Sequence, residues 1–245
     1  MLLLHGISCL IAKDGSMNIG GLQKVSLIDY PGKISAIIFT QGCNFRCPYC
    51  HNPGLVDPKL YKPCLFPKDI LDFLAHRRGK LDAVTITGGE PTLQEDLIPL
   101  IQKIRKMGFA VKLDSNGSRP AVLDRLLKEK LLDFIALDIK APLDKYSQVV
   151  KVQMDTGAIA QSVRLVIQSK IPQEFRTTVV KSMLTQKDIL AIAKEIAGAK
   201  RYVLQRFQPA QTLDPEFAGE QLFPEEELLK LKKQLEKMFP LVLIR

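Results

Sequence analysis

Six apolar runs of strand length recur along the chain, and amphipathic segments of helix length separate them. Each run is nearly continuous rather than alternating, which is typical of strands buried on both faces of a parallel sheet covered by helices. The runs are ISAIIFT (34–40), AVTIT (83–87), FAVKLD (109–114), DFIALDI (133–139), FRTTVV (175–180) and YVLQRF (202–207).

The amphipathic segments predict helices near 67–78, 94–107, 120–131, 155–170, 186–198 and 224–238. A last apolar stretch, PLVLIR (240–245), could add an edge strand. Strand and helix therefore alternate about six times, and crossovers between parallel strands are right-handed. This order predicts an α/β fold, an open or partly closed (β/α)6 barrel.

The chain has 245 residues, 46% of them hydrophobic, which is enough for one sizeable core. We expect a single domain over 17–245 and an N-terminal extension over 1–16. The apolar run of that extension is too short to span a bilayer and lacks the features of a signal peptide. The five cysteines are odd in number and lie mostly on one loop, which fits a reduced, cytoplasmic protein without disulfides.

The formal net charge of +9 comes from basic residues that are scattered along the predicted helices. No arginine-rich arm or base-stacking motif accompanies them, so we expect solvated helix faces and no nucleic-acid or membrane partner. A positive rim that attracts an anionic cofactor or an acidic protein is the alternative use of this charge.

Unusual polar clusters lie at the ends of five of the six predicted strands. They are QGCNFRCPYCHNPG (41–54), TGGEPT (87–92), DSNGS (114–118), DIK (138–140) and QPA (208–210). Loops at the carboxyl ends of the strands build the site in barrels and open α/β sheets. Each cluster alone could be an ordinary turn or a surface ion pair, but five of them at one end predict a functional site.

The first cluster contains three cysteines within eight residues, Cys43, Cys47 and Cys50, and no fourth follows at a comparable spacing. Three thiolates can bind three irons of a [4Fe-4S] cluster and leave the fourth iron open for chemistry. The alternative is a structural zinc site in which His51 supplies the fourth ligand. Cys64 has no cysteine neighbour, so we expect a packed or surface thiol there.

The other clusters supply the groups that an amino acid joined to a nucleoside would need. A glutamate can accept from an amino group, a lysine can pair with a carboxylate, and glycines allow backbone to approach a ligand closely. A polar DSN segment suits ribose hydroxyls, and a tyrosine supplies an aromatic wall. The ligand that combines these parts and can chelate iron is S-adenosylmethionine. Its candidate contacts are Tyr49, Gly88, Gly89, Glu90, Asp114, Ser115, Asn116 and Lys140.

These motifs resemble those of the radical S-adenosylmethionine (radical SAM) superfamily, in which a CxxxCx-aromatic-C motif is followed by a GGEP-type turn. Cys43, Cys47, Tyr49 and Cys50 match the first motif, and 88–91 match the second. More narrowly, the segments 17–53 and YVLQRFQPAQTLDP (202–215) are similar to activating enzymes of glycyl-radical enzymes. Within these, the likeness is to activating proteins of anaerobic ribonucleoside-triphosphate reductase.

The resemblance implies that YCH (49–51), the GGE turn, DSNG (114–117) and DIK contact S-adenosylmethionine, which adds His51 and Asp138 to the candidate contacts. In some relatives a histidine follows the phenylalanine of the last barrel strand, whereas here Gln208 does. Larger activating enzymes insert a cysteine-rich, ferredoxin-like domain before the GGE turn. In this chain that interval contains only Cys64, so a single cluster is expected.

The resemblance also implies a reaction. A one-electron donor such as flavodoxin or ferredoxin would reduce the cluster, and S-adenosylmethionine would be cleaved to methionine and a 5′-deoxyadenosyl radical. That radical would abstract a hydrogen atom from a backbone glycine of the partner, which we expect to be anaerobic ribonucleotide reductase. The alternatives are another glycyl-radical enzyme, such as pyruvate formate-lyase, or a small-molecule substrate.

Overall fold

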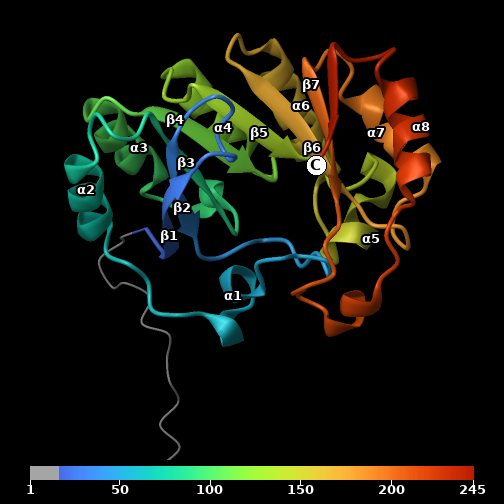
Figure 1. Ribbon diagram of the computed structural model, residues 1–245, viewed down its shortest axis with the longest axis horizontal. Helices are drawn as coiled ribbons and strands as arrows, with labels where there is room; N and C mark the ends of the chain where they lie inside the picture. The colour runs from blue at the N-terminus through green and yellow to red at the C-terminus, as the bar shows by residue number, and fades with distance from the viewer. Residues whose placement is uncertain (1–16) are drawn as a thin grey trace, which may run out of the picture.

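The computed structural model describes residues 17–245, and the expected extension, with Cys9, lies outside the described residues. One eight-stranded sheet runs in the order β1 to β8, and its first and last strands do not pair with each other (Figure 1). All neighbours are parallel except β1 and β2. The predicted partial (β/α)6 barrel is therefore confirmed.

The six predicted strands and the predicted edge strand are present, with bounds that differ by one or two residues. The strands are β1 (Ile19–Ser26), β2 (Ser35–Thr40), β3 (Ala83–Gly88), β4 (Ala110–Ser115), β5 (Phe134–Asp138), β6 (Gln173–Val179), β7 (Arg201–Arg206) and β8 (Leu241–Ile244). The apolar runs did not predict β1. Its sequence, IGGLQKVS, has two glycines and polar residues because this antiparallel strand lies at the sheet edge and is partly exposed.

The six predicted helices are also present, together with two short ones, α1 and α5. The helices are α1 (Pro53–Val56), α2 (Pro67–His76), α3 (Leu97–Lys106), α4 (Pro120–Lys128), α5 (Tyr146–Val150), α6 (Thr156–Gln168), α7 (Gln186–Glu195) and α8 (Glu225–Leu235). Proline is the first residue of α2 and α4, where its missing N–H would have no partner. Helix α3 starts three residues later than predicted because the backbone at Gln94 is extended, with φ = −82° and ψ = 121°.

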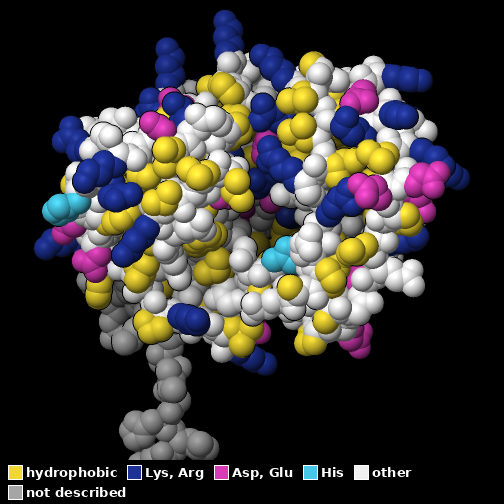
Figure 2. All heavy atoms as spheres, in the orientation of Figure 1, with side chains coloured by type: hydrophobic (Ala, Val, Ile, Leu, Met, Phe, Trp, Pro, Cys, Tyr) yellow, Lys and Arg dark blue, Asp and Glu magenta, His cyan; other side chains and the backbone are white. Residues whose placement is uncertain are grey.

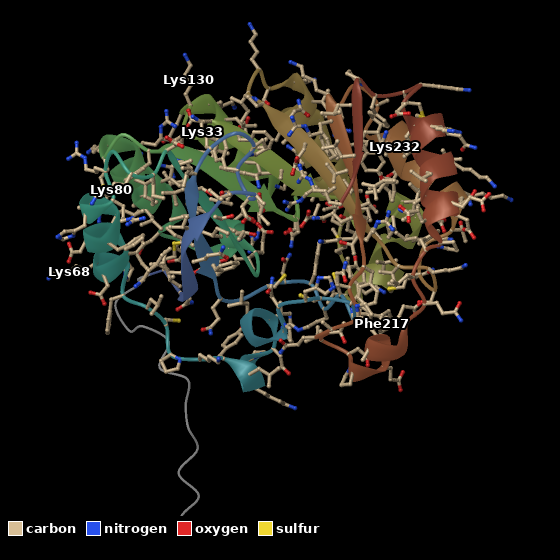
Figure 3. All side chains as sticks on the ribbon, in the orientation of Figure 1. Lys33, Lys68, Lys80, Lys130, Phe217 and Lys232 are labelled. Atoms are coloured by element: carbon tan, nitrogen blue, oxygen red, sulfur yellow. The ribbon has the colours of Figure 1, made fainter. Side chains whose placement is uncertain are left out.

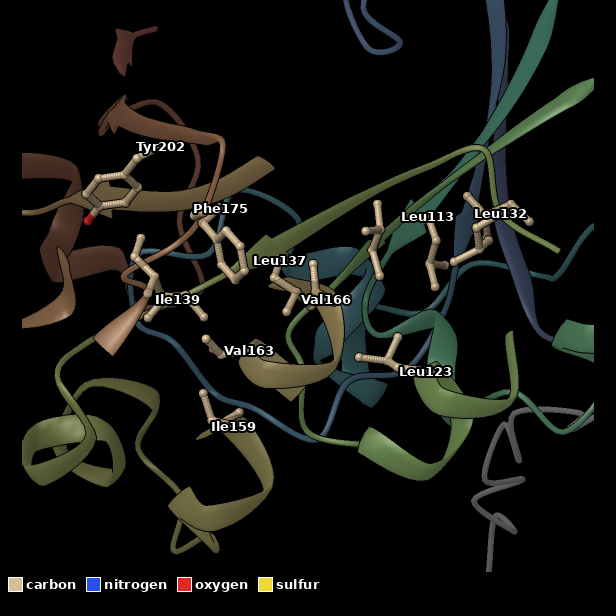
Figure 4. Close-up of a cluster of buried hydrophobic side chains, with 14 of the residues drawn as sticks. Leu113, Leu123, Leu132, Leu137, Ile139, Ile159, Val163, Val166, Phe175 and Tyr202 are labelled. Carbon is tan, nitrogen blue, oxygen red and sulfur yellow. The ribbon is translucent and has the colours of Figure 1, made fainter. Parts of the chain in front are cut away.

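The main core lies between the sheet and its helices. Figure 4 shows Leu113, Leu137 and Phe175 of β4, β5 and β6 close to Val163 and Val166 of α6. All are buried. Because neighbouring residues of a strand point to opposite faces, the other face of these strands is turned into the barrel. That inner face carries charged side chains, which matters for the site.

The irregular segment 207–224, which follows β7, crosses the carboxyl end of the barrel. The Asp214 N–H donates to the Pro48 carbonyl in the cysteine loop at 2.9 Å, and the Ser182 hydroxyl donates to Glu220 at 2.6 Å. A 3₁₀ turn, Pro215–Gly219, lies within it, and Phe217 marks this turn in Figure 3. None of the helices in 17–245 is long and apolar enough to cross a membrane.

Candidate active site

A cavity of about 320 Å³ lies at the carboxyl ends of the parallel strands. This volume is within the range of roughly 300–1,000 Å³ that small-molecule sites occupy. Thirteen of the fourteen predicted site residues line it: Cys43, Cys47, Tyr49, Cys50, His51, Gly88, Gly89, Glu90, Asp114, Ser115, Asn116, Asp138 and Lys140. The exposed fourteenth, Gln208, lines a separate cavity of about 40 Å³, and its contact with the cofactor stays a prediction.

The cysteine loop is fixed by backbone hydrogen bonds. Gly42 has φ = 104°, a left-handed conformation that suits glycine, and its N–H donates to the Leu55 carbonyl at 2.8 Å. The Arg46 guanidinium donates to the carbonyls of Cys43 and Phe45 at 2.7 and 2.8 Å. The Arg46 N–H donates to the Val150 carbonyl at the end of α5. Hydrogen bonds within the loop and to the neighbouring helices therefore hold the cysteine loop in place.

The two glycines before Glu90 allow the turn after β3 to touch the cysteine loop. A Cβ atom at Gly89 would lie 2.0 Å from the Gly42 carbonyl oxygen, and one at Gly88 would lie 2.3 Å from the Thr40 nitrogen. The Glu90 N–H donates to the same Gly42 carbonyl at 2.8 Å. The sequence suggested that these glycines let backbone approach a ligand. In this structure they let backbone approach backbone, and so position the cysteines.

Glu90 is completely buried and accepts hydrogen bonds from the neighbouring strand end. The Ser115 hydroxyl donates to Oε1 at 2.8 Å, and the Asn116 N–H donates to Oε2 at 2.6 Å. The Thr92 N–H and hydroxyl also donate to Oε1. Burial raises the pKa of Glu90. Within 17–245 Oε2 accepts from the Asn116 N–H alone, so a lone pair is left for a ligand's amino group.

An ion-pair network fills the barrel beside the cavity, and Arg176 of β6 is at its centre. The Arg176 guanidinium donates to Asp138 at 2.6 Å and to Asp114 at 3.0 Å. Lys112 pairs with Asp114 at 2.6 Å, and Lys140 pairs with Asp138 at 3.2 Å. Each carboxylate is thus shared by Arg176 and one lysine.

Arg176 and Lys112 were not among the site residues predicted from the sequence. Both lie inside apolar runs, and the signal that could have found them is charge at alternate positions of a buried strand. Lys112 with Asp114 on β4 and Glu174 with Arg176 on β6 follow this period of two, which turns both members of a pair to the same face.

This network should make stability depend on acid pH. Burial raises the pKa of Asp138, but Arg176 and Lys140 outweigh it, so the pKa lies well below its usual range. A carboxyl with a lowered folded-state pKa stabilises the fold above its unfolded pKa of about 3.9, and this contribution is lost as the pH falls towards the folded pKa. Urea unfolding of the metal-free protein at pH 7, 4 and 3 should show that the free energy of unfolding falls below pH 4. This fall should be smaller in Asp138→Asn.

The matched control for that measurement is Asp124→Asn. Asp124 pairs with Lys128 on the exposed face of α4, where an ion pair contributes little. This variant should keep the acid dependence of the unsubstituted protein. If Asp138→Asn lost as much stability below pH 4 as the unsubstituted protein, Asp138 would not be a source of the acid dependence.

The three thiols have the chemistry that an iron–sulfur cluster needs, whereas no three His, Cys, Asp or Glu side chains in 17–245 are placed to hold a single metal ion. Burial raises the pKa of Cys43 to about 11 and that of Cys47 to about 12, and the Lys140 ammonium opposes the shift in both. Burial raises the pKa of Cys50 as well. Buried thiols of this kind are neutral until a metal supplies the positive charge that favours their thiolates. Three soft sulfur donors on one loop match an iron–sulfur cluster.

The remaining walls fit an amphipathic cofactor. Tyr49 lines the cavity, and its buried hydroxyl has no hydrogen-bond partner within the described residues. The His51 ring stacks on Phe207, with ring centroids 5.5 Å apart. Burial lowers the pKa of His51, so its ring is neutral near pH 7. Two aromatic residues, Tyr49 and His51, and the cationic Lys140 therefore line one space beside the thiols.

The sequence profile of the radical SAM superfamily matches residues 37–201. The chain belongs to this superfamily. A protein of Methanocaldococcus jannaschii, named by inference a glycyl-radical enzyme activating enzyme, is 38% identical over 93% of this chain and 95% of its own length. The pyruvate formate-lyase-activating enzyme of Clostridium pasteurianum is 32% identical over 50% of this chain and 52% of that enzyme.

Solved structures agree on the fold at lower sequence identity. SuiB of Streptococcus suis bound to its precursor peptide SuiA has a TM-score of 0.67 at 13% identity, and the match covers 84% of this chain and 47% of SuiB. QueE from Escherichia coli has a TM-score of 0.53 at 16% identity, with 92% of both chains covered. The superfamily implies a [4Fe-4S] cluster and S-adenosylmethionine, and the thiols and cavity walls described above fit both.

Proposed function

We propose that this protein uses a [4Fe-4S] cluster and S-adenosylmethionine to generate a glycyl radical on anaerobic ribonucleoside-triphosphate reductase. The observation that carries the proposal is the meeting of three thiols with ten other predicted site residues around one cavity. Similarity over nearly the full length to a relative named for this kind of activation supports the class of reaction. The likeness of 17–53 and 202–215 to reductase-activating proteins supports the particular target.

The chain's own side chains would bind and orient the cofactors. Cys43, Cys47 and Cys50 would bind the cluster, and Lys140 would pair with the carboxylate of S-adenosylmethionine. When bound, cluster and S-adenosylmethionine together supply one-electron cleavage of a carbon–sulfur bond. Glu90 and Arg176 would keep the strand ends in place around them. The electron would come from a small protein donor such as flavodoxin or ferredoxin.

Replacement of Lys140 by alanine should weaken S-adenosylmethionine binding while the cluster is retained. The side chain is mostly buried, and a hydrogen bond to a charged group contributes about 1.5–3 kcal/mol, so affinity should fall about 10-fold or more. Equilibrium dialysis of the anaerobically reconstituted protein measures this affinity, and iron content reports the cluster. Lys145→Ala is the control, because Lys145 pairs with Asp188 outside the cavity. Equal affinity in both variants would remove Lys140 from the site.

The target is tested by competition. The reconstituted protein is given reductant, S-adenosylmethionine, and equal amounts of unactivated anaerobic ribonucleotide reductase and pyruvate formate-lyase from one cell. Electron paramagnetic resonance then measures glycyl radical on each after separation. We expect radical on the reductase. Equal activation of the formate-lyase would overturn the choice of target, and radical on neither protein would overturn the proposed function.

Pyruvate formate-lyase is the second candidate target. The observation that favours it is the similarity of half of this chain to the Clostridium pasteurianum enzyme. Specificity between the two partners is a difference of docking energies, so it should reside in surface residues near the cavity rather than in the cofactor contacts.

A further inference from the structure

The turn between β1 and β2 exposes two large apolar side chains. Leu27 is 71% exposed and Ile28 is 84% exposed, and Val25 and Ile34 beside them are also exposed. Single exposed apolar residues are common, but four of them within residues 25–34 make this turn a candidate interaction surface. We call residues 24–34 the β1–β2 hairpin tip.

The hairpin tip precedes β2 and packs on the first residues of β3 and β5, so it lies at the amino-terminal ends of the parallel strands and reaches the cavity from that end. Asp29, the residue after Ile28, lines the same cavity as the three cysteines. Tyr30 is buried and packs against Phe134 at the start of β5, with ring centroids 5.8 Å apart. The tip is therefore held against the barrel by Tyr30, while Leu27 and Ile28 remain outside.

The tip is also positively charged. Lys24 and Lys33 flank the apolar group and are exposed, and the Lys33 ammonium lies 5.9 Å from the centre of the Tyr30 ring. Figure 3 labels Lys33 at this turn. The nearby carboxylates already accept hydrogen bonds, Asp29 from the Ser26 hydroxyl and Asp82 from the Ile34 N–H.

Two arginines at the last two strands lie near buried residues of the barrel. The Arg201 guanidinium lies 5.8 Å from the centre of the Phe134 ring, against which Tyr30 also packs. Arg245, which follows the edge strand β8, is 41% exposed in its side chain and pairs with the buried Glu174. Figure 2 shows hydrophobic side chains to the left of the hollow at the centre of this face, and Lys and Arg side chains along its upper side.

From these contacts we infer that the β1–β2 hairpin tip is a docking element for the partner protein. The segment that binds the tip is an extended stretch of the partner, next to the glycine that receives the radical. Its apolar side chains pack on Leu27 and Ile28, and its acidic side chains pair with Lys24 and Lys33. Charge complementarity and the place of Asp29 in the cavity wall carry this choice. The inference rests on the proposed function, because it requires a protein substrate.

The test uses the double variant Leu27→Ser, Ile28→Ser of the full, reconstituted protein. The probe is the unactivated glycyl-radical enzyme that the unsubstituted protein activates in the competition above. Affinity for the probe and the rate of glycyl-radical formation should fall about 10-fold or more, because two buried apolar side chains are lost from the interface. Cleavage of S-adenosylmethionine without the probe should be unchanged. The control is Leu229→Ser, since Leu229 on α8 is 46% exposed away from the tip.

A second variant tests the charges. Lys24→Glu, Lys33→Glu should weaken binding several-fold at low salt, and the difference should shrink at high salt because exposed charges are screened. Lys68→Glu on the distant helix α2, labelled in Figure 3, is its control.

The outcomes separate the two proposals. If the unsubstituted protein activates the probe and the Leu27, Ile28 variant does so equally well, the docking inference is overturned and the function stands. The same applies if Leu229→Ser is equally defective, or if the double variant alters only self-association of this chain. If the unsubstituted protein activates neither glycyl-radical enzyme, both proposals fall.

Discussion

Alanine at Cys43, Cys47 or Cys50 should leave the protein without a stable [4Fe-4S] cluster after anaerobic reconstitution with iron and sulfide. Each replacement removes one of three protein ligands, and the iron left without a thiolate is open to solvent and loss. Cleavage of S-adenosylmethionine should fall to the background without enzyme, because no other group in the described site can pass it an electron. Iron content, the absorbance of the cluster and 5′-deoxyadenosine formation measure this result.

The matched control is Cys64→Ala. The Cys64 thiol is half-buried, lies 3.2 Å from the Gln41 amide oxygen, and does not line the cavity. This variant should bind iron and cleave S-adenosylmethionine like the unsubstituted protein. Near-stoichiometric zinc in the reconstituted protein, without iron uptake, would instead support the zinc site.

Arg176→Ala should destabilise the metal-free protein by about 3–5 kcal/mol, the usual effect of removing one partner from a buried ion pair. The guanidinium side chain is 10% exposed and links Asp114 of β4 to Asp138 of β5. Without it, the two carboxylates repel each other with only one lysine each. Urea unfolding at pH 7 measures the loss, and S-adenosylmethionine binding should weaken too because both aspartates line the cavity.

Two further variants show whether the geometry or only the charge matters. Arg176→Lys keeps the charge but cannot donate to both aspartates at once. Its stability should therefore lie between that of the unsubstituted protein and that of Arg176→Ala. Arg125→Ala removes an exposed pair with Glu129 and should cost less than about 1 kcal/mol. If Arg176→Ala were as stable as Arg125→Ala, the network would have no structural importance.

The order of strands and helices could be predicted from the sequence because burial on both faces of a parallel sheet requires continuous apolar runs. The edge strand β1 was missed for the same reason. This strand is antiparallel and partly exposed, and its two glycines are more typical of a loop than of a strand. Helices α1 and α5 have four and five residues, too few to show helical periodicity.

The sequence alone predicted which loops meet at the cavity, because side chains at the carboxyl ends of successive parallel strands must converge. It could not determine what each side chain does there. The contacts of Glu90 with Asn116 and of Arg176 with Asp114 join residues 26 and 62 positions apart. Such contacts depend on strand register and on which face each residue takes. Only the tertiary structure therefore decided that Gly88 and Gly89 fit against the cysteine loop, that Arg176 joins two aspartates, and that the hairpin tip lies beside the cavity.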